Sequence, residues 1–379
     1  APQGAAAALA APLGAGAVTA ERSAVADGAP AAPDATASSP PPSTPRTRKP
    51  SAATPEETLA TPAKTSNLAR AFEGRRGQCR RLPDEDADVV LDELVDSYFA
   101  TCHEQSQRFR PDVDVLRQRF RDADRETVLN WLVQACDVMG YSDSVLLSTV
   151  GLLDRYCAAA APPPGRRMQT VLLAVLCTAL KAVAVQDEVL GHGGNRPLRD
   201  QLWHLGQHQV PAEDVLRAER QVLQVLQFDV TGPCPLEFLD ALSAPLASPA
   251  RPADGSPPRY LANFLLQLSM FDAEMYYRYP HAVLAAGALD VALCSLRAAP
   301  QVRQCLVEDV ARACPDVPDA AGRVQACALE LQGVWRDFAA SSGARAHSLL
   351  RKFGGARLAP LAAAIASPPP PDRDAVGAG

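Results

Sequence analysis

Residues 168–181 have the sequence MQTVLLAVLCTALK, an almost uninterrupted apolar run that ends on a lysine. The run contains no glycine or proline and is too short to cross a bilayer, so it predicts a helix that is buried on nearly every side. Such a helix needs other helices to cover it. Apolar residues recur at helical spacing in the flanking segments 126–160 and 211–230. The sequence therefore predicts a compact all-α domain over residues 126–230, with residues 168–185 as its central helix.

The charge and cysteine pattern narrows the class of protein. The net charge of −6 argues against a nucleic-acid-binding surface, which is normally basic. The ten cysteines are single, mostly inside apolar runs, and form no CxxC pair or Cys/His cluster, so we expect core thiols in a reducing compartment and no metal site. No segment has eighteen apolar residues without a charge or a helix breaker, and we expect a soluble protein that does not contact a membrane.

Glycine, proline and composition divide the rest of the chain. The Ala/Pro-rich opening lacks the basic start of a secretory signal and, like the end of the chain, is too poor in large apolar side chains to fold. After the first five-helix domain, a second series of five helices follows in similar order and length. The predicted parts are a disordered tail (1–67), an N-terminal helix and connector (68–125), the first domain (126–230), the second domain (231–355) and a second disordered tail (356–379).

The pattern also predicts individual helices, with breaks where turn residues cluster. An outlying helix is expected over residues 89–108, followed by a charged connector over 112–124 without a clear apolar stripe. The first domain is predicted to contain helices 126–141, 143–160, 168–186, about 197–206 and 211–227. The second is predicted to contain helices 235–243, 259–273, 280–297, 302–313 and 319–340, and a short amphipathic piece SLLRKF follows.

An acidic cluster, DEDAD at residues 84–88, precedes the outlying helix. It is open to two interpretations. Carboxylates in such a cluster would suit a magnesium site of an all-α enzyme. Acids at a helix N-terminus also complement the helix dipole, and the chain has no second acidic motif to share a metal. The second interpretation is favoured.

Four ordered motifs resemble the cyclin family, and mitotic cyclins in particular. They are RETVLNWLV at residues 125–133, LLDRY at 152–156, the apolar run ending on Lys181, and LRAERQVLQVLQFD at 216–229; the segment 264–289 is similar to the second cyclin box. The resemblance implies two tandem five-helix cyclin boxes, with an outlying N-terminal helix. It also implies a regulatory subunit, with no catalytic residue and no cofactor of its own, that forms a heterodimer with a cyclin-dependent serine/threonine kinase and activates it in cell-cycle control.

The resemblance assigns the kinase-binding role to Lys181, Glu219 and Phe228. Each charged residue alone has an ordinary structural explanation, because a lysine at a helix end suits the dipole and a glutamate on a surface helix aids solubility. In cyclins the two lie side by side and hydrogen-bond the kinase main chain. Val183 and Ala184 stand where the family usually has glutamates, which removes part of the acidic patch that faces the kinase.

A second implied site is the hydrophobic groove that binds Arg-x-Leu substrate peptides in cyclins. The matching positions are Val128, Trp131, Leu132 and Gln169. The methionine that usually opens the groove is Asp124, and the acidic residue after the Trp-Leu-Val run is Gln134, so peptide docking is expected to be altered or lost.

Arg125, Asp154 and Arg155 resemble the internal polar network that braces the cyclin box. An acid beside a base also suggests catalysis, but neighbouring residues do not face each other on a helix, which favours the structural role. Thr61 and Ser256 precede prolines and are candidate sites of modification by a proline-directed kinase. Small basic clusters in the N-terminal tail are consistent with localisation in the nucleus and/or cytoplasm.

Two alternatives remain open. One is a divergent cyclin-fold interaction protein that binds partners without activating a kinase, for which the altered patch residues speak. The other is a transcription-related cyclin fold that binds promoter DNA, against which the acidic charge balance weighs.

Overall fold

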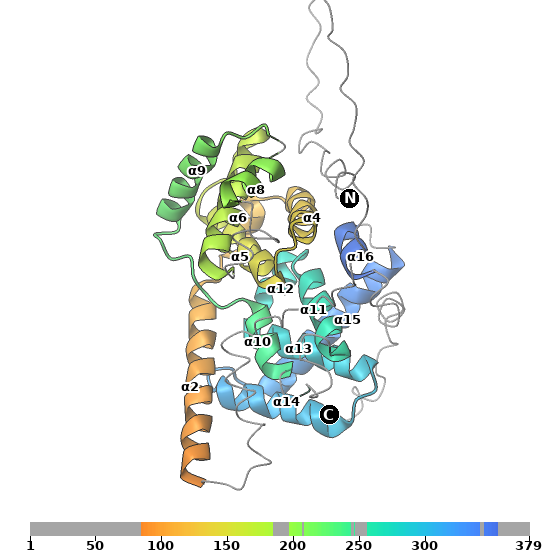
Figure 1. Cartoon of the computed structure of the whole chain (residues 1–379). Helices are drawn as coiled ribbons and strands as arrows, with labels where there is room; N and C mark the ends of the chain where they lie inside the picture. Colours follow the sequence, from red (N-terminus) through yellow and green to blue (C-terminus); the bar gives the residue numbers. More distant parts are fainter. Residues whose placement is uncertain are drawn as a thin grey trace, which may run out of the picture. The chain divides into compact units, whose positions relative to one another are not determined.

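The computed structural model describes residues 85–184, 197–206, 208–243, 246, 256–341 and 345–354. Across these ranges the regular elements are helices, and no strand occurs (Figure 1). None of the helices in the described residues is long and apolar enough to span a bilayer. The predicted tails, and Thr61 with them, lie outside the described residues.

The first group of helices is arranged around α6 (Figure 1). Met168 and every residue from Val171 to Leu180 are buried in α6, which packs against α5, α9 and α8. The predicted central helix is therefore confirmed. The group comprises α3 (Val113–Arg119), α4 (Asp122–Met139), α5 (Asp143–Ala159), α6 (Arg166–Val183), α8 (Leu198–Leu205) and α9 (Ala212–Val225). The outlying α2 (Glu85–Arg108) precedes this group in the chain and packs instead against α13 (His281–Ser295) and α14 (Pro300–Ala313).

Local signals explain where α4 ends and α5 begins. Gly140 ends α4 with φ 69°, a left-handed conformation that glycine adopts without a steric penalty. Ser142 then caps α5 by accepting a hydrogen bond from the backbone N–H of Val145. This tight connection sets α4 against α5.

The charged connector predicted over residues 112–124 is wrong, because α3 occupies most of it and α4 begins at Asp122. Asp112 caps α3 through a hydrogen bond from the Val115 N–H at 3.1 Å. Leu116 and Phe120 are fully buried. Two apolar residues among many charges do not make a recognisable stripe in the sequence, but they suffice to anchor a two-turn helix on the core.

The second group is arranged around α13, which is buried from Ala282 to Leu293 and packs against α15, α11 and α10. One more helix is present than predicted: Asp272 caps the short α12 by accepting from the Met275 N–H at 3.1 Å, in a stretch expected to be helix end and loop. The group comprises α10 (Pro235–Ser243), α11 (Pro257–Ser269), α12 (Ala273–Arg278), α13 (His281–Ser295), α14 (Pro300–Ala313), α15 (Ala320–Ala340) and α16 (His347–Phe353).

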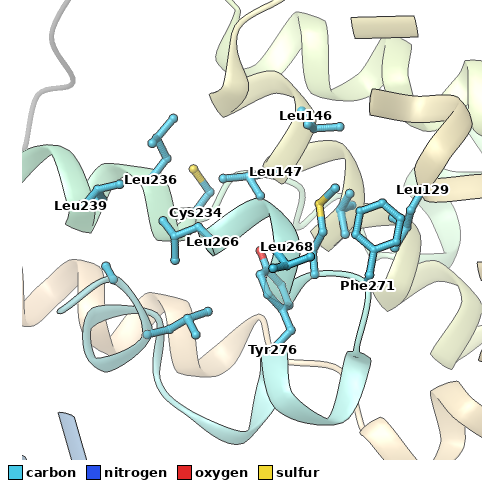
Figure 2. Close-up of a cluster of buried hydrophobic side chains, with 14 of the residues drawn as sticks. Leu129, Leu146, Leu147, Cys234, Leu236, Leu239, Leu266, Leu268, Phe271 and Tyr276 are labelled. Atoms are coloured by element: carbon cyan, nitrogen blue, oxygen red, sulfur yellow. The ribbon is translucent and has the colours of Figure 1, made fainter. Parts of the chain in front are cut away.

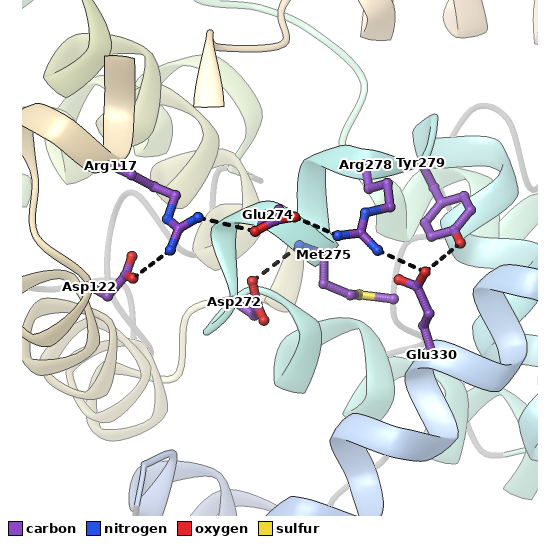
Figure 3. Close-up of polar contacts among 8 residues, drawn as sticks. All are labelled: Arg117, Asp122, Asp272, Glu274, Met275, Arg278, Tyr279 and Glu330. Atoms are coloured by element: carbon purple, nitrogen blue, oxygen red, sulfur yellow. Dashed lines mark hydrogen bonds and ion pairs between the residues drawn. The ribbon is translucent and has the colours of Figure 1, made fainter. Parts of the chain in front are cut away.

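Buried side chains of the two groups meet in one apolar cluster (Figure 2). Leu129, Leu146 and Leu147 come from α4 and α5, whereas Leu266 and Tyr276 come from α11 and α12. The polar contacts of Figure 3 also cross between the groups, because Arg117 of α3 pairs with Glu274 of α12 at 3.1 Å. The two groups therefore share part of their core.

The helix α16 packs against α4, although about 220 residues separate them in sequence. The Asn130 Oδ1 atom accepts from the Ser348 N–H at 3.1 Å and from the Ser348 hydroxyl at 2.7 Å. The Asn130 Nδ2 atom donates to the Arg345 carbonyl at 2.8 Å. Farther along α16, Lys352 bonds to Asp143 of α5 and to Gln267 of α11. The last helix thus ties the two groups together.

Candidate partner-binding site

Lys181 and Glu219 form an ion pair although they lie 38 positions apart in sequence. The Lys181 Nζ atom is 2.7 Å from Glu219 Oε1 and 2.8 Å from Oε2. Lys181 occupies the last turn of α6, where the buried run reaches the surface, and Glu219 lies on α9, which packs along α6. The expectation that these residues meet through the fold is confirmed.

The two members of the pair differ in burial. The Lys181 side chain is 49% exposed, whereas that of Glu219 is only 9% exposed because Val215, Ala218 and Val222 hold this face of α9 against the core. Burial alone would lower the pKa of Lys181, but the hydrogen bond and charge of Glu219, together with Cys177, outweigh it and raise the pKa. One half-exposed ammonium therefore contacts both oxygens of a nearly buried carboxylate.

Phe228 follows α9 and is 68% exposed, the most exposed large apolar side chain of the described residues. Its φ is 61°, and the preceding Gln227 has φ 53°. A non-glycine residue in the left-handed region is strained, and such strain is concentrated at binding and switch sites. The Phe228 N–H donates to the Leu223 carbonyl at 2.7 Å, so the turn that ends α9 fixes the backbone that presents the exposed ring.

Leu216 on α9 was missed by the sequence analysis. It is 57% exposed, on the same helix as Glu219. In the sequence it reads as one more apolar residue of an amphipathic helix. A helical-wheel projection could have found it, because Leu216 falls outside the buried stripe formed by Val215, Ala218 and Val222.

The internal polar network is built on Arg125 and Asp154, both fully buried. Arg125 Nε donates to Asp154 Oδ1 at 2.9 Å and Nη2 donates to Oδ2 at 2.6 Å, while Nη1 donates to the Met270 carbonyl. The Tyr277 hydroxyl donates to Asp154 Oδ2 at 2.8 Å. Burial opposes the charge on Arg125, but Asp154 outweighs it and the net effect raises the pKa of Arg125.

Arg155 does not belong to this network, contrary to expectation. Its guanidinium lies 4.5 Å from the centre of the Phe109 ring, a cation–π contact. Neighbouring residues point to different faces of a helix, so Asp154 faces the core whereas Arg155 is only partly buried.

The predicted peptide groove is only partly available. Val128 and Leu132 are buried in the core, whereas Trp131 and Gln169 are partly exposed. The neighbouring side chain of Gln134 lies 3.3 Å from His347 of α16. The assignment of Val128 and Leu132 to an open groove is therefore wrong, because these side chains fill space inside the helical group.

Ser256 is a poor modification site in this structure. It is 5% exposed at the start of α11, and its hydroxyl is buried with no hydrogen-bond partner among the described residues. A kinase would have to unfold the start of α11 to reach it.

The acidic cluster coincides with the start of α2 at Glu85. Asp84 and the side chains of residues 85–88 lie outside what the structure describes, so the interpretation that the acids complement the helix dipole stays a prediction. Within the described ranges, no group of three or more His, Cys, Asp or Glu side chains is arranged to hold a metal ion.

Comparison with known proteins finds similarity to one family. Residues 97–231 match the family model "Cyclin, N-terminal domain". Cyclin-B2-2 of Arabidopsis thaliana is 28% identical over 232 residues, covering 57% of this chain and 50% of that protein. G2/mitotic-specific cyclin-4 of Saccharomyces cerevisiae is 27% identical over 227 residues, covering 59% of this chain and 46% of that protein. The chain thus spans about half the length of the curated relatives it matches.

A solved structure of a viral cyclin from herpesvirus saimiri aligns with 62% of this chain and 97% of that one, at 15% identity and a TM-score of 0.47. The helical groups and the sequence matches define an all-α protein that carries an N-terminal cyclin domain. Residues 97–231 are therefore similar to the N-terminal domain of cyclins, and the longer matches are to B-type and other mitotic cyclins.

Proposed function

We propose that this chain is a regulatory subunit that binds a cyclin-dependent protein kinase as a heterodimer and activates it in cell-cycle control. The single observation that carries the proposal is the Lys181–Glu219 pair at the rim of α6 and α9, the positions that the cyclin resemblance assigns to kinase binding. Similarity to a family of regulatory subunits supports a role without catalysis by the chain itself.

The pair has the chemistry of an interface anchor. Lys181 can donate further hydrogen bonds and Glu219 can accept them, so a kinase main chain docked here would gain charge-assisted bonds once water is excluded. Leu216 and Phe228 supply exposed apolar surface on and next to the same helix. Polar anchors beside exposed apolar side chains are typical of a specific protein interface.

The test is a pull-down of the tagged full chain from a dividing-cell lysate, followed by a histone-kinase assay on the eluate. We expect the chain to retain a kinase and the eluate to phosphorylate histone. The Lys181→Ala variant should lose both signals. The matched control is Arg199→Ala, which removes a positive charge from the exposed face of α8 and should retain both. Absence of kinase with the unaltered chain would contradict the proposal.

A second candidate is a cyclin-fold protein that binds a partner without activating it. The observation that favours it is the loss of acidic side chains after the central helix, where Val183 and Ala184 are half-buried next to Lys181. The same assay separates the two functions, because a non-activating cyclin would retain kinase without histone phosphorylation.

We also propose that the chain docks Arg-x-Leu peptides and is located in the nucleus and/or cytoplasm. Only Trp131 and Gln169 of the predicted groove reach the surface, so we expect weak peptide binding. Fluorescence microscopy of the tagged chain checks the localisation.

A further inference from the structure

A pocket of about 230 Å³ opens between the end of α11, the start of α12, α15 and the segment before α16. Its apolar lining comes from Leu268, Phe271, Val334 and Phe338. Leu268, Phe271 and Phe338 form a buried floor, each with 4–7% of its surface exposed, and Val334 is partly exposed. Sites for drug-sized ligands are larger, at roughly 300–1,000 Å³, so this pocket has the size for one long side chain.

The pocket is separate from the sites described above. The predicted peptide groove, with Trp131 and Gln169 at its surface, belongs to α4 and α6, and the ion pair of Lys181 and Glu219 belongs to α6 and α9. Among the described residues that line the pocket, none comes from α4, α6 or α9. A ligand of this pocket therefore leaves both of those sites open.

Two carboxylates line the pocket and are exposed, those of Asp272 and Asp337. Asp272 caps α12 with Oδ1, which accepts from the Met275 N–H; its Oδ2 atom forms no hydrogen bond or ion pair within the described part of the chain (Figure 3). The Asp337 carboxylate likewise has no such partner among the described residues. Its neighbour Arg336 donates instead to the Gln332 carbonyl at 3.3 Å.

Two arginines near the pocket are already paired with other carboxylates. Arg345 lines the pocket and pairs with Glu126 at 3.1 Å. Arg117, whose charge acts on Asp272, pairs with Glu274 at 3.1 Å and with a second carboxylate of α4. The pocket therefore combines an apolar floor with an excess of negative charge.

An arginine side chain complements both properties. Its aliphatic stem can cover apolar surface while the charged head stays in contact with water, and its five N–H donors can serve two carboxylates at once. We propose that the pocket docks one arginine side chain from a peptide segment of a partner protein. The stem packs on Phe271 and Phe338, the guanidinium bonds to Asp272 and Asp337, and a small apolar neighbour in the peptide contacts Val334.

The test is titration of the purified full chain with the blocked pentapeptide Ala-Val-Arg-Ala-Gly, observed by saturation-transfer NMR on the peptide signals. This peptide lacks the leucine of an Arg-x-Leu motif. The matched ligand has citrulline in place of arginine, which keeps the shape and removes the charge. We expect saturable binding of the arginine peptide and about tenfold weaker binding of the citrulline peptide, because charge-assisted hydrogen bonds are roughly twice as strong as neutral ones.

Variants separate the contacts. Asp337→Asn and Asp272→Asn each remove one charge, and the second retains an oxygen that can cap α12. Either should weaken binding of the arginine peptide several-fold and leave the citrulline peptide nearly unchanged. Arg345→Gln removes a cation that lines the pocket and should strengthen binding of the arginine peptide several-fold. Glu104→Gln removes an exposed acid from α2 and is the matched control, with no change expected.

Four results would overturn the proposal. The first is no saturable binding of the arginine peptide, and the second is equal affinity for the arginine and citrulline peptides. The third is unchanged affinity in the double variant of Asp272→Asn with Asp337→Asn. The fourth is loss of binding in Trp131→Ala, which would place the peptide in the predicted groove.

Other occupants of the pocket would give other results, and each would replace the partner peptide. Much tighter peptide binding by a chain that ends at Gly354 would show that residues 355–379 compete for the pocket. Dissociation of a dimer by the peptide, measured by sedimentation, would show that a second copy of the chain occupies it. Lys181→Ala should bind the peptide normally, so the proposed kinase role and this docking surface can fail separately.

Discussion

At the scale of single residues, burial makes the charge of Arg125 costly unless Asp154 neutralises it. Arg125 is fully buried, and Asp154 neutralises it through two hydrogen bonds. The variant Asp154→Asn keeps the shape and leaves the guanidinium without a counter-charge. We expect a loss of about 3–5 kcal/mol in the free energy of unfolding, measured by urea denaturation.

The double variant Arg125→Met with Asp154→Leu removes both charges and is the matched control. Its loss of stability should be smaller than the summed losses of Arg125→Met and Asp154→Leu measured singly, because neither charge is left without its partner. Additive losses would show that the two residues do not depend on each other.

A second residue-scale prediction concerns Glu237 on α10. Burial, with a smaller effect of Asp240, raises its pKa from 4.5 to about 7, although the Cys234 N–H partly offsets this by donating to the carboxylate. Between these values the folded chain binds the proton more tightly than the unfolded chain. Stability from this group is therefore fully present below pH 4.5 and is lost as pH rises through 7.

The variant Glu237→Gln cannot ionise and still accepts from the Cys234 N–H. It should exceed the unaltered chain in stability at pH 8 by at most about 3 kcal/mol and match it near pH 4.5. Urea denaturation at the two pH values measures the difference. A constant difference across pH would contradict the assignment.

The third residue-scale prediction concerns the ion pair at the rim of α6 and α9. Lys181 is half-exposed, so Lys181→Ala should lower the free energy of unfolding by only about 0–1 kcal/mol. Glu219→Ala should cost more, because that side chain is nearly buried. Kinase affinity should fall by roughly 2–5 kcal/mol for either variant, which surface plasmon resonance with a purified kinase can measure. Large destabilisation with normal affinity would assign the pair a structural role only.

At the scale of elements, α16 depends on the side chain of Asn130. This amide accepts from Ser348 twice and donates to the Arg345 and Glu126 carbonyls. Asn130→Ala should lower the free energy of unfolding by about 1–3 kcal/mol, because buried partners are left unsatisfied. Hydrogen exchange should also rise in α16 before it rises in α6. The conservative variant Asn130→Asp retains the acceptor and should lose less; equal exchange in both helices would contradict this role for Asn130.

The elements also show what the sequence can and cannot predict. Central helices such as α6 are predictable because burial on every side leaves an uninterrupted apolar run. The helices α3 and α12 are short, and each depends on an aspartate cap and a few contacts with distant helices, which no local pattern reveals.

The candidate site divides in the same way. The cyclin resemblance predicted that Lys181 lies beside Glu219, and the structure confirms that the two residues are in contact. The burial of Val128 and Leu132, the exposure of Leu216 and the separation of Arg155 from Asp154 depend on which face of each helix meets the core. That choice is made by tertiary packing, so residue identities alone could not supply it.

At the scale of the described residues as a whole, the apolar cluster that joins the two helical groups predicts one cooperative unfolding transition (Figure 2). Leu147→Ala, at the centre of the shared cluster, should cost about 2–5 kcal/mol. Trp131 lies in the first group and Trp335 in the second. Two single-tryptophan proteins should therefore report the same urea midpoint, shifted equally by Leu147→Ala. Separate midpoints would show that the groups unfold independently.

The hydrogen bond from Arg125 to the Met270 carbonyl also has a consequence for biosynthesis. The acceptor is encoded 145 positions after the donor. At a translation rate of about 5–20 residues per second, Arg125 is synthesised roughly 7–30 s before that carbonyl exists. During this interval the nascent first group has a charged guanidinium with an incomplete set of partners, so its arginine stays hydrated and its final compaction waits for the arrival of α11 and α12.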